Sequence, residues 1–68
     1  MEFQLKFSCV NAAFWTEIED GNYELSYNEI GRVLRRTAFS VEERKTEGII
    51  RDINGNTIGS WALLYEED

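Results

Sequence analysis

The chain has 68 residues, of which seven are Lys or Arg and thirteen are Asp or Glu, so its formal net charge is −6. This length fits one domain over residues 1–68, and the negative charge argues against nucleic acid as a general partner. The single cysteine excludes an internal disulfide, and the absence of histidine removes the commonest general base and zinc ligand. Small domains without such supports often gain stability by self-association, so a homodimer is one expectation.

The N-terminal residues alternate between polar and apolar types, whereas a secretory signal would begin with an unbroken apolar stretch. No apolar run approaches the roughly 20 residues that cross a bilayer. We therefore expect a soluble, cytoplasmic protein without a membrane partner.

The first predicted element is a strand over residues 2–10. Its apolar side chains fall on one side and its polar side chains on the other, which is the period of a half-buried strand. The inward-facing residues would be Phe3, Leu5, Phe7 and Cys9.

Residues 11–25 have no sustained period, contain the turn signal Asp20-Gly21-Asn22 and carry many acids, so they are predicted to be an irregular connection. A short strand around residues 14–18 is an alternative. Phe14 and Trp15 are expected to pack back onto the sheet edge or to mark a contact site. The acids could instead mimic a nucleic-acid backbone toward another protein, although charged loops usually serve solubility alone.

A helix is predicted to begin at Tyr27, because Ser26-Tyr27-Asn28-Glu29 forms a capping box. In such a box Ser26 accepts from the amide of Glu29, and the Glu29 carboxylate accepts from the amide of Ser26. Gly48 fits the reversal into the next strand. An apolar stripe at helical spacing is expected to face the sheet. Its members are Tyr27, Ile30, Val33, Leu34, Thr37, Ala38 and Val41.

Residues 48–65 contain two apolar runs around Asn54-Gly55-Asn56, and Asn-Gly between β-prone runs favours a tight hairpin. The preferred register places apolar residues opposite one another: Ile53 with Ile58, Ile49 with Ala62 and Ile50 with Trp61. The alternative, centred on Asn54-Gly55, sets Ile58 opposite Arg51. A bulge at Gly59-Ser60 would bring Ile58 onto the face of Trp61.

The predicted architecture is therefore α+β, in the order β-α-β-β, with one helix on a three-stranded, mainly antiparallel sheet. One helix covers only one face of a sheet, and exposed apolar surface usually marks an interaction site. The open face and the loop before the helix are the predicted protein-binding surface. Its candidate residues are Phe14, Trp15, Ile50, Trp61, Leu63 and Tyr65.

Three arginines and one aromatic residue form a second candidate patch on the helix, away from the apolar stripe. Arg32, Arg35 and Arg36 lie at i, i+3 and i+4, and Phe39 lies one turn further on. Such a patch could bind phosphate backbones or an acidic protein surface. A solvated helix face, neutralised by the acidic loop, is the plainer interpretation.

No catalytic, metal or cofactor site is predicted. Residues 52–56 resemble the start of a calcium loop, but Thr57 replaces the required glycine and Leu63 replaces the required glutamate. Cys9 is expected to be a small core residue, and no histidine is present to activate a nucleophile. The chain is therefore expected not to be an enzyme.

Three segments resemble a group of small phage and prophage-encoded proteins. The segments are Asn11-Ala12-Ala13-Phe14, Glu29-Ile30-Gly31-Arg32-Val33-Leu34-Arg35, and residues 48–61 with their Asp52-Ile53-Asn54-Gly55-Asn56 hairpin. This chain differs in having Gly31 where alanine is usual, and in a longer loop before the helix. The resemblance implies a phage or mobile-element origin and assigns no biochemical activity.

Together these features predict a non-enzymatic protein-binding module of phage type, acting in the host cytoplasm as an inhibitor of a host or anti-phage defence protein. The alternative is a nucleic-acid-binding accessory protein that uses the basic helix face. A structural component of the virion is a third class that the sequence leaves open.

Overall fold

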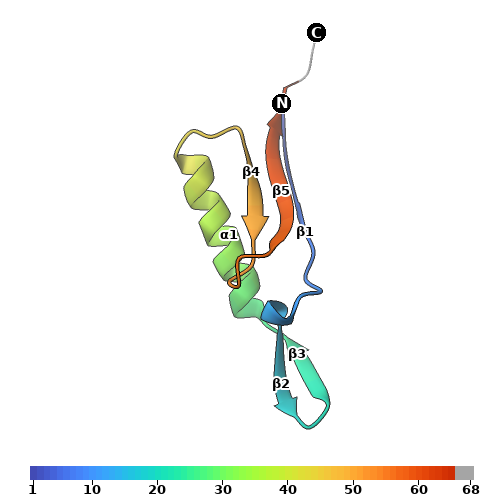
Figure 1. Ribbon diagram of the computed structural model, residues 1–68. Helices are drawn as coiled ribbons and strands as arrows, with labels where there is room; N and C mark the ends of the chain where they lie inside the picture. The colour runs from blue at the N-terminus through green and yellow to red at the C-terminus, as the bar shows by residue number, and fades with distance from the viewer. Residues whose placement is uncertain (66–68) are drawn as a thin grey trace.

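The computed structural model describes residues 1–65 and shows an α+β fold (Figure 1). The elements are β1 (Glu2–Phe7), a short 3-10 helix η1 (Ala12–Phe14), β2 (Trp15–Glu19), β3 (Asn22–Leu25), α1 (Tyr27–Glu42), β4 (Glu47–Arg51) and β5 (Thr57–Leu64). An antiparallel sheet has the order β1-β5-β4, and β2 and β3 pair separately. The predicted β-α-β-β order with a three-stranded sheet is confirmed, with one added hairpin.

The helix begins where the capping residues predicted. The amide of Glu29 donates to the Ser26 hydroxyl at 3.3 Å, and α1 starts at Tyr27. The reciprocal bond of the capping box is absent, because the Ser26 amide donates to the Phe14 carbonyl at 2.7 Å. The Glu29 carboxylate is thus available for other partners.

The end of the helix differs from the prediction. Arg44 has a φ of 70° and takes the left-handed position that Gly48 was expected to take. Gly48 lies inside β4, where a Cβ would come within 2.6 Å of Trp61 Nε1. Glycine is needed there because the indole ring of Trp61 lies directly against the backbone.

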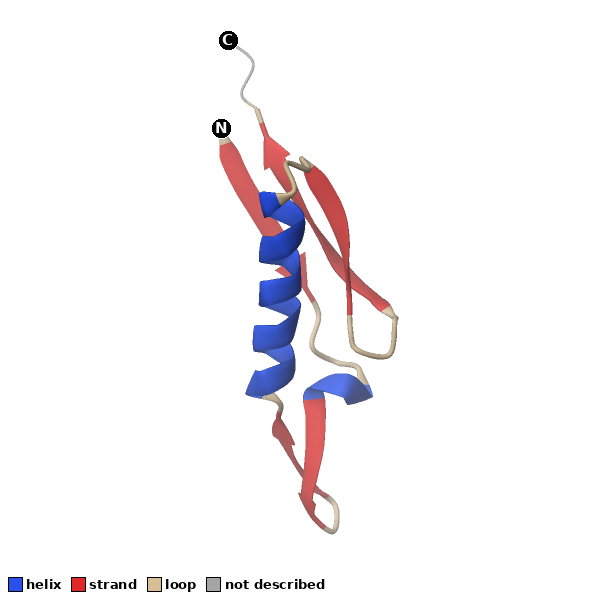
Figure 2. Cartoon of the chain, turned by 90° about the vertical axis from the view of Figure 1, so that its left-hand side faces the viewer, coloured by secondary structure: helices blue, strands red, loops and turns tan. Residues whose placement is uncertain are grey.

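Residues 11–25 are not an irregular connection, and that prediction was wrong. They form η1 and the β2–β3 hairpin, which projects from one end of the molecule (Figures 1 and 2). The alternative of a short strand was close, since β2 spans Trp15–Glu19. All five residues of β2 are exposed, so the strand has no buried face that would impose an alternating pattern on its sequence.

The register of the β4–β5 hairpin also differs from the preferred one. Ile50 pairs with Gly59 and Ile49 pairs with Ser60, and the register shifts between Ile50 and Arg51, which pairs with Thr57. Ile58 is therefore the extra residue of a bulge, one position before the predicted site. Over residues 47–50, β4 pairs with β5 in the alternative register, the one centred on Asn54-Gly55.

Within residues 1–65 the fully buried apolar core consists of one side chain from each of four elements. They are Phe14 of η1, Val33 of α1, Ile50 of β4 and Trp61 of β5. Phe3 stacks against Trp61 with a centroid distance of 5.6 Å. Helix α1 is too short and too polar to span a membrane, and the described chain has no other helix of comparable length.

Candidate functional site

The residues predicted to form one binding surface do not lie together. Phe14, Ile50 and Trp61 are at most 3 % exposed, and Leu63 is half-buried. The observed register turns Ile50 and Trp61 toward α1 instead of the open face, so their assignment to a partner surface is corrected. Trp15 and Tyr65 are exposed but belong to separate parts of the fold: Trp15 is the first residue of β2 in the two-stranded sheet, and Tyr65 follows β5 of the three-stranded sheet.

Helix α1 buries only part of the predicted apolar stripe, with Ile30 and Val41 packed against the core. Its buried residues are Glu29, Val33 and Thr37, with the Thr37 hydroxyl donating to the Val33 carbonyl at 3.0 Å. Leu34 is 45 % exposed and Tyr27 is 78 % exposed, although both belong to the apolar stripe. The helix is thus rotated so that part of its apolar stripe points beside the sheet, toward β1.

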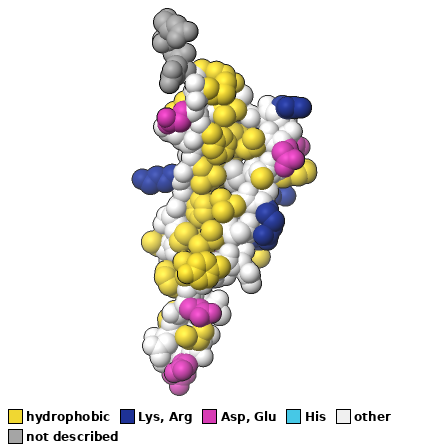
Figure 3. All heavy atoms as spheres, turned by 180° about the vertical axis from the view of Figure 1, so that it is seen from behind, with side chains coloured by type: hydrophobic (Ala, Val, Ile, Leu, Met, Phe, Trp, Pro, Cys, Tyr) yellow, Lys and Arg dark blue, Asp and Glu magenta, His cyan; other side chains and the backbone are white. Residues whose placement is uncertain are grey.

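An apolar groove lies between that part of the helix and β1. Its volume is about 380 Å³, and Phe3 and Leu5 of β1 face Leu34 of α1 across it. The remaining lining residues are Thr37, Ala38, Val41 and Glu42. Figure 3 shows an apolar band running along this side of the molecule. We call the space lined by these seven residues the α1–β1 groove.

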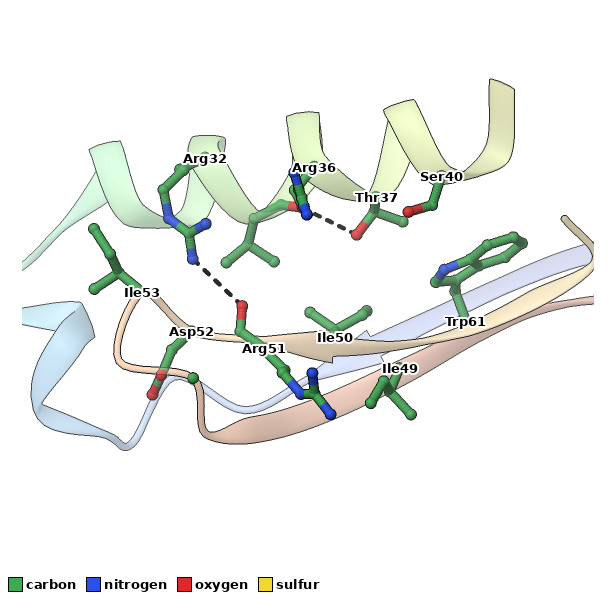
Figure 4. Close-up of a pocket in the computed structure, with 12 residues that line it drawn as sticks. Arg32, Arg36, Thr37, Ser40, Ile49, Ile50, Arg51, Asp52, Ile53 and Trp61 are labelled. Atoms are coloured by element: carbon green, nitrogen blue, oxygen red, sulfur yellow. Dashed lines mark hydrogen bonds between the residues drawn. The ribbon is translucent and has the colours of Figure 1, made fainter. Parts of the chain in front are cut away.

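A second hollow of about 430 Å³ lies between α1 and β4, with a more polar lining (Figure 4). Arg32 crosses it, donating from Nη2 to the carbonyl of Arg51 at 3.3 Å. The Arg51 side chain points away from the helix, while Ile50 and Trp61 form the floor of the hollow (Figure 4). A polar contact thus joins α1 to the end of β4 on this side of the sheet, beside an open hollow.

The basic patch on α1 is divided between different environments. Arg32 Nε donates to Glu29 Oε1 at 2.6 Å, and Arg36 lines the hollow beside β4. The Arg35 guanidinium lies over Gly31, and Phe39 is 58 % exposed. Since Glu29 offsets the charge of Arg32, the patch is less basic than its sequence indicates.

Glu29 is the centre of a polar junction under the helix. Its carboxylate accepts from Arg32 and, at 2.8 Å, from the backbone N–H of Ile53. The hydrogen bonds from Arg32, with that from Ile53, lower the pKa of Glu29 despite its burial. The same carboxylate raises the pKa of Arg32. Sequence reasoning missed this role because it assigned Glu29 to the capping box.

Asp52 organises the neighbouring turn. Asn11 Nδ2 donates to Asp52 Oδ2 at 3.0 Å, and the amides of Asn54 and Asn56 donate to Oδ1 at 3.0 and 2.9 Å. These donors, Asn11 foremost, hold the pKa of Asp52 below its usual value. Asn11, Glu29 and Asp52 come from three separate segments of the chain, and their hydrogen bonds join the hairpin turn to η1 and α1.

The β2–β3 hairpin carries exposed apolar and acidic side chains. Trp15 Nε1 donates to the Cys9 carbonyl at 2.8 Å, which ties the base of the hairpin to the chain after β1. Ile18 and Tyr23 are more than half exposed, and Glu17 and Glu24 are exposed beside them. These side chains cover both sides of a two-stranded ribbon and do not form a concave site.

Among residues 1–65, no three side chains of the metal-ligating types gather at one place. No protein-family model matches the chain, and neither the curated proteins nor the solved structures contain a significant match to it.

Proposed function

We propose that this chain is a non-enzymatic protein-binding module whose binding surface is the α1–β1 groove. The observation that supports the proposal most directly is the rotation of α1. Leu34 and Ala38 are exposed beside Phe3, so apolar residues of a helix and of a strand line one open channel. Contiguous apolar surface of this kind usually serves an interaction.

The shape of the chain supports the same proposal. Its accessible surface is 5442 Å², whereas a compact folded chain of 68 residues has about 4,400 Å². Its radius of gyration is 14.5 Å, against about 11 Å for a compact domain of this length. The surface thus exceeds that of a compact chain by roughly 1,000 Å², and a standard interface takes about 800 Å² from each partner.

The charge of the chain indicates the chemistry of the partner. A net charge of −6, with Glu42 in the groove lining, favours an apolar segment flanked by basic side chains. The resemblance of three segments to phage and prophage-encoded proteins supports a host protein, such as an anti-phage defence factor, as that partner. Inhibition of the partner is the expected outcome of binding.

Two variants of one helix test the proposal. The chain is immobilised, host-cell lysate is passed over it, and captured proteins are quantified by mass spectrometry. Leu34→Ser, in the groove, should lower capture of the specific partner about tenfold, because complete burial of a Leu side chain contributes about 1.5–3 kcal/mol. Phe39→Ser, on another side of α1, is the matched comparison and should leave capture unchanged. A loss of capture in Phe39→Ser alone would instead place the partner on the basic helix face.

Both side chains are about half exposed, so neither variant should unfold, and urea denaturation checks this point. Equal capture by Leu34→Ser and by the unaltered chain would refute the groove as the binding surface.

A further inference from the structure

Strand β1 forms one edge of the three-stranded sheet, and no described element lies along its other side (Figure 1). The amide of Ser8, just after β1, donates to the carbonyl of Ile58 in β5 at 3.0 Å. This hydrogen bond continues the register of the β1–β5 pairing. Backbone groups alternate in direction along an antiparallel pair. The even-numbered residues of β1 therefore bond to β5, and Phe3, Leu5 and Phe7 direct their N–H and C=O groups to the open edge.

The opposite edge of the sheet is formed by β4, and the end of this strand is covered by other residues. Helix α1 lies along β4, and the Arg51 carbonyl, which points away from β5, accepts from Arg32. Just beyond β4, the Ile53 amide donates to Glu29. An open strand edge is a template for pairing with another chain. The end of β4 is occupied by these contacts, whereas the structure of residues 1–65 shows no such contact on the outer edge of β1.

The side chains of β1 are complementary to those of a second β1 in antiparallel orientation. With the two-fold axis at Gln4, Glu2 of each copy lies opposite Lys6 of the other, and Gln4 lies opposite Gln4. On the other face of the strands, Phe3 lies opposite Leu5. In this register the outward-directed backbone groups of Phe3 and Leu5 form the hydrogen-bonded pairs, which an antiparallel ladder requires.

We propose that two copies of this chain join through their β1 strands in this register and form one continuous sheet, with three strands from each copy. Glu2 and Lys6 are both exposed, and neither has an ion-pair partner within residues 1–65. Pairing gives each of them an opposite charge at the close spacing of a non-hydrogen-bonded pair.

The dimer also extends the α1–β1 groove. Phe3 and Leu5 of the two copies become neighbours on the sheet face that carries both helices. The α1–β1 grooves of the two copies therefore join into one continuous apolar surface. The edge and the groove are different surfaces, and this inference goes beyond the proposed function. A failure of one does not entail a failure of the other.

Charge reversal tests the pairing and its register. Sedimentation velocity over a wide concentration range should show the unaltered chain as a monomer–dimer equilibrium. Glu2→Lys and Lys6→Glu should each weaken the dimer at least about tenfold, because two attractive cross-strand pairs become repulsive. The variant with both changes restores opposite charges and should recover the dimer to within a few-fold of the original Kd.

Cross-linking gives a second readout in a Cys9→Ser background. Gln4→Cys places two thiols on the two-fold axis at a Cα separation of about 4.5 Å, which suits a disulfide. Mild air oxidation should therefore yield a covalent dimer. Lys6→Cys is the matched control, since its two copies lie about 13 Å apart in this register and should stay unlinked.

The proposal is overturned if the unaltered chain is monomeric at every concentration, or if the doubly reversed variant dimerises no better than either single variant. Equal cross-linking by Gln4→Cys and Lys6→Cys would overturn the register.

Discussion

The Glu29 carboxylate and the Ile53 amide, joined by a 2.8 Å hydrogen bond, connect the first turn of α1 to the loop between β4 and β5. With Arg32 on the same carboxylate, this contact holds a charged group under the helix where an apolar residue would be expected. Glu29 lies on the buried side of α1 together with Val33 and Thr37.

Replacing Glu29 with glutamine should therefore destabilise the fold. Glu29→Gln removes the charge that Arg32 pairs with and weakens the three hydrogen bonds that this carboxylate accepts, so the free energy of unfolding should fall by about 2 kcal/mol. Urea denaturation measures the change. Glu24→Gln, at an exposed position of β3, should alter stability by no more than about 0.5 kcal/mol. Similar losses in the two variants would contradict a specific role for the junction.

Stability should decline in acid. The pKa values of Glu29 and Asp52 are lowered from ordinary values of 4.5 and 3.8, so the unfolded chain takes up protons before the folded chain does. Their contribution is present above those ordinary values and is lost as pH falls through the lower folded pKa values. Urea midpoints measured from neutral pH to about pH 2 should decrease below about pH 4.5. Glu29→Gln should show a shallower decrease, and an unchanged slope would rule out Glu29 as a contributor.

Two glycines should respond to alanine in opposite directions. A Cβ on Gly31 would meet only the mobile end of Arg35, at 3.1 Å, so Gly31→Ala should stabilise α1 by about 0.5–1 kcal/mol. A Cβ on Gly59 would lie 2.0 Å from the Lys6 carbonyl, so Gly59→Ala should break the β1–β5 pairing. Thermal unfolding distinguishes them, and a loss of stability in Gly31→Ala would show that the contact with Arg35 matters.

Binding to duplex DNA should be absent even at low salt, where phosphate contacts are strongest. The net charge is −6, and Glu29 offsets Arg32 within the only basic patch predicted from the sequence. Fluorescence anisotropy with labelled duplex measures this directly. Binding that Arg35→Glu or Arg36→Glu abolishes would instead establish the basic helix face as a nucleic-acid site.

Elements that depend on residues close together in the sequence could be predicted from it. The alternation of β1 and the Ser26 cap of α1 are examples, because burial on one face and a single hydroxyl decide them. The β2–β3 hairpin was missed because both its faces are exposed, so no alternation marks it.

The proposed binding surface could not be predicted from the sequence, because it depends on contacts between distant segments. Asp52 accepts hydrogen bonds from Asn54, Asn56 and Asn11. The turn that these bonds stabilise occurs with a strand register different from the one that pairs apolar residues with one another. The burial of Glu29 rotates α1 away from the orientation that its apolar stripe indicates. Together these two effects place Trp61 inside the fold and Leu34 outside it.

The contact between Arg32 and the Arg51 carbonyl limits how far the sheet can grow. A pair joined through β1 uses the open edge of both copies, and each outer end of the enlarged sheet is then a β4 strand flanked by its own helix. In the proposed dimer, Arg32 occupies the outward carbonyl at the end of each β4, and α1 lies beside that strand. These contacts favour an assembly that stops at two copies over one that continues into a fibre.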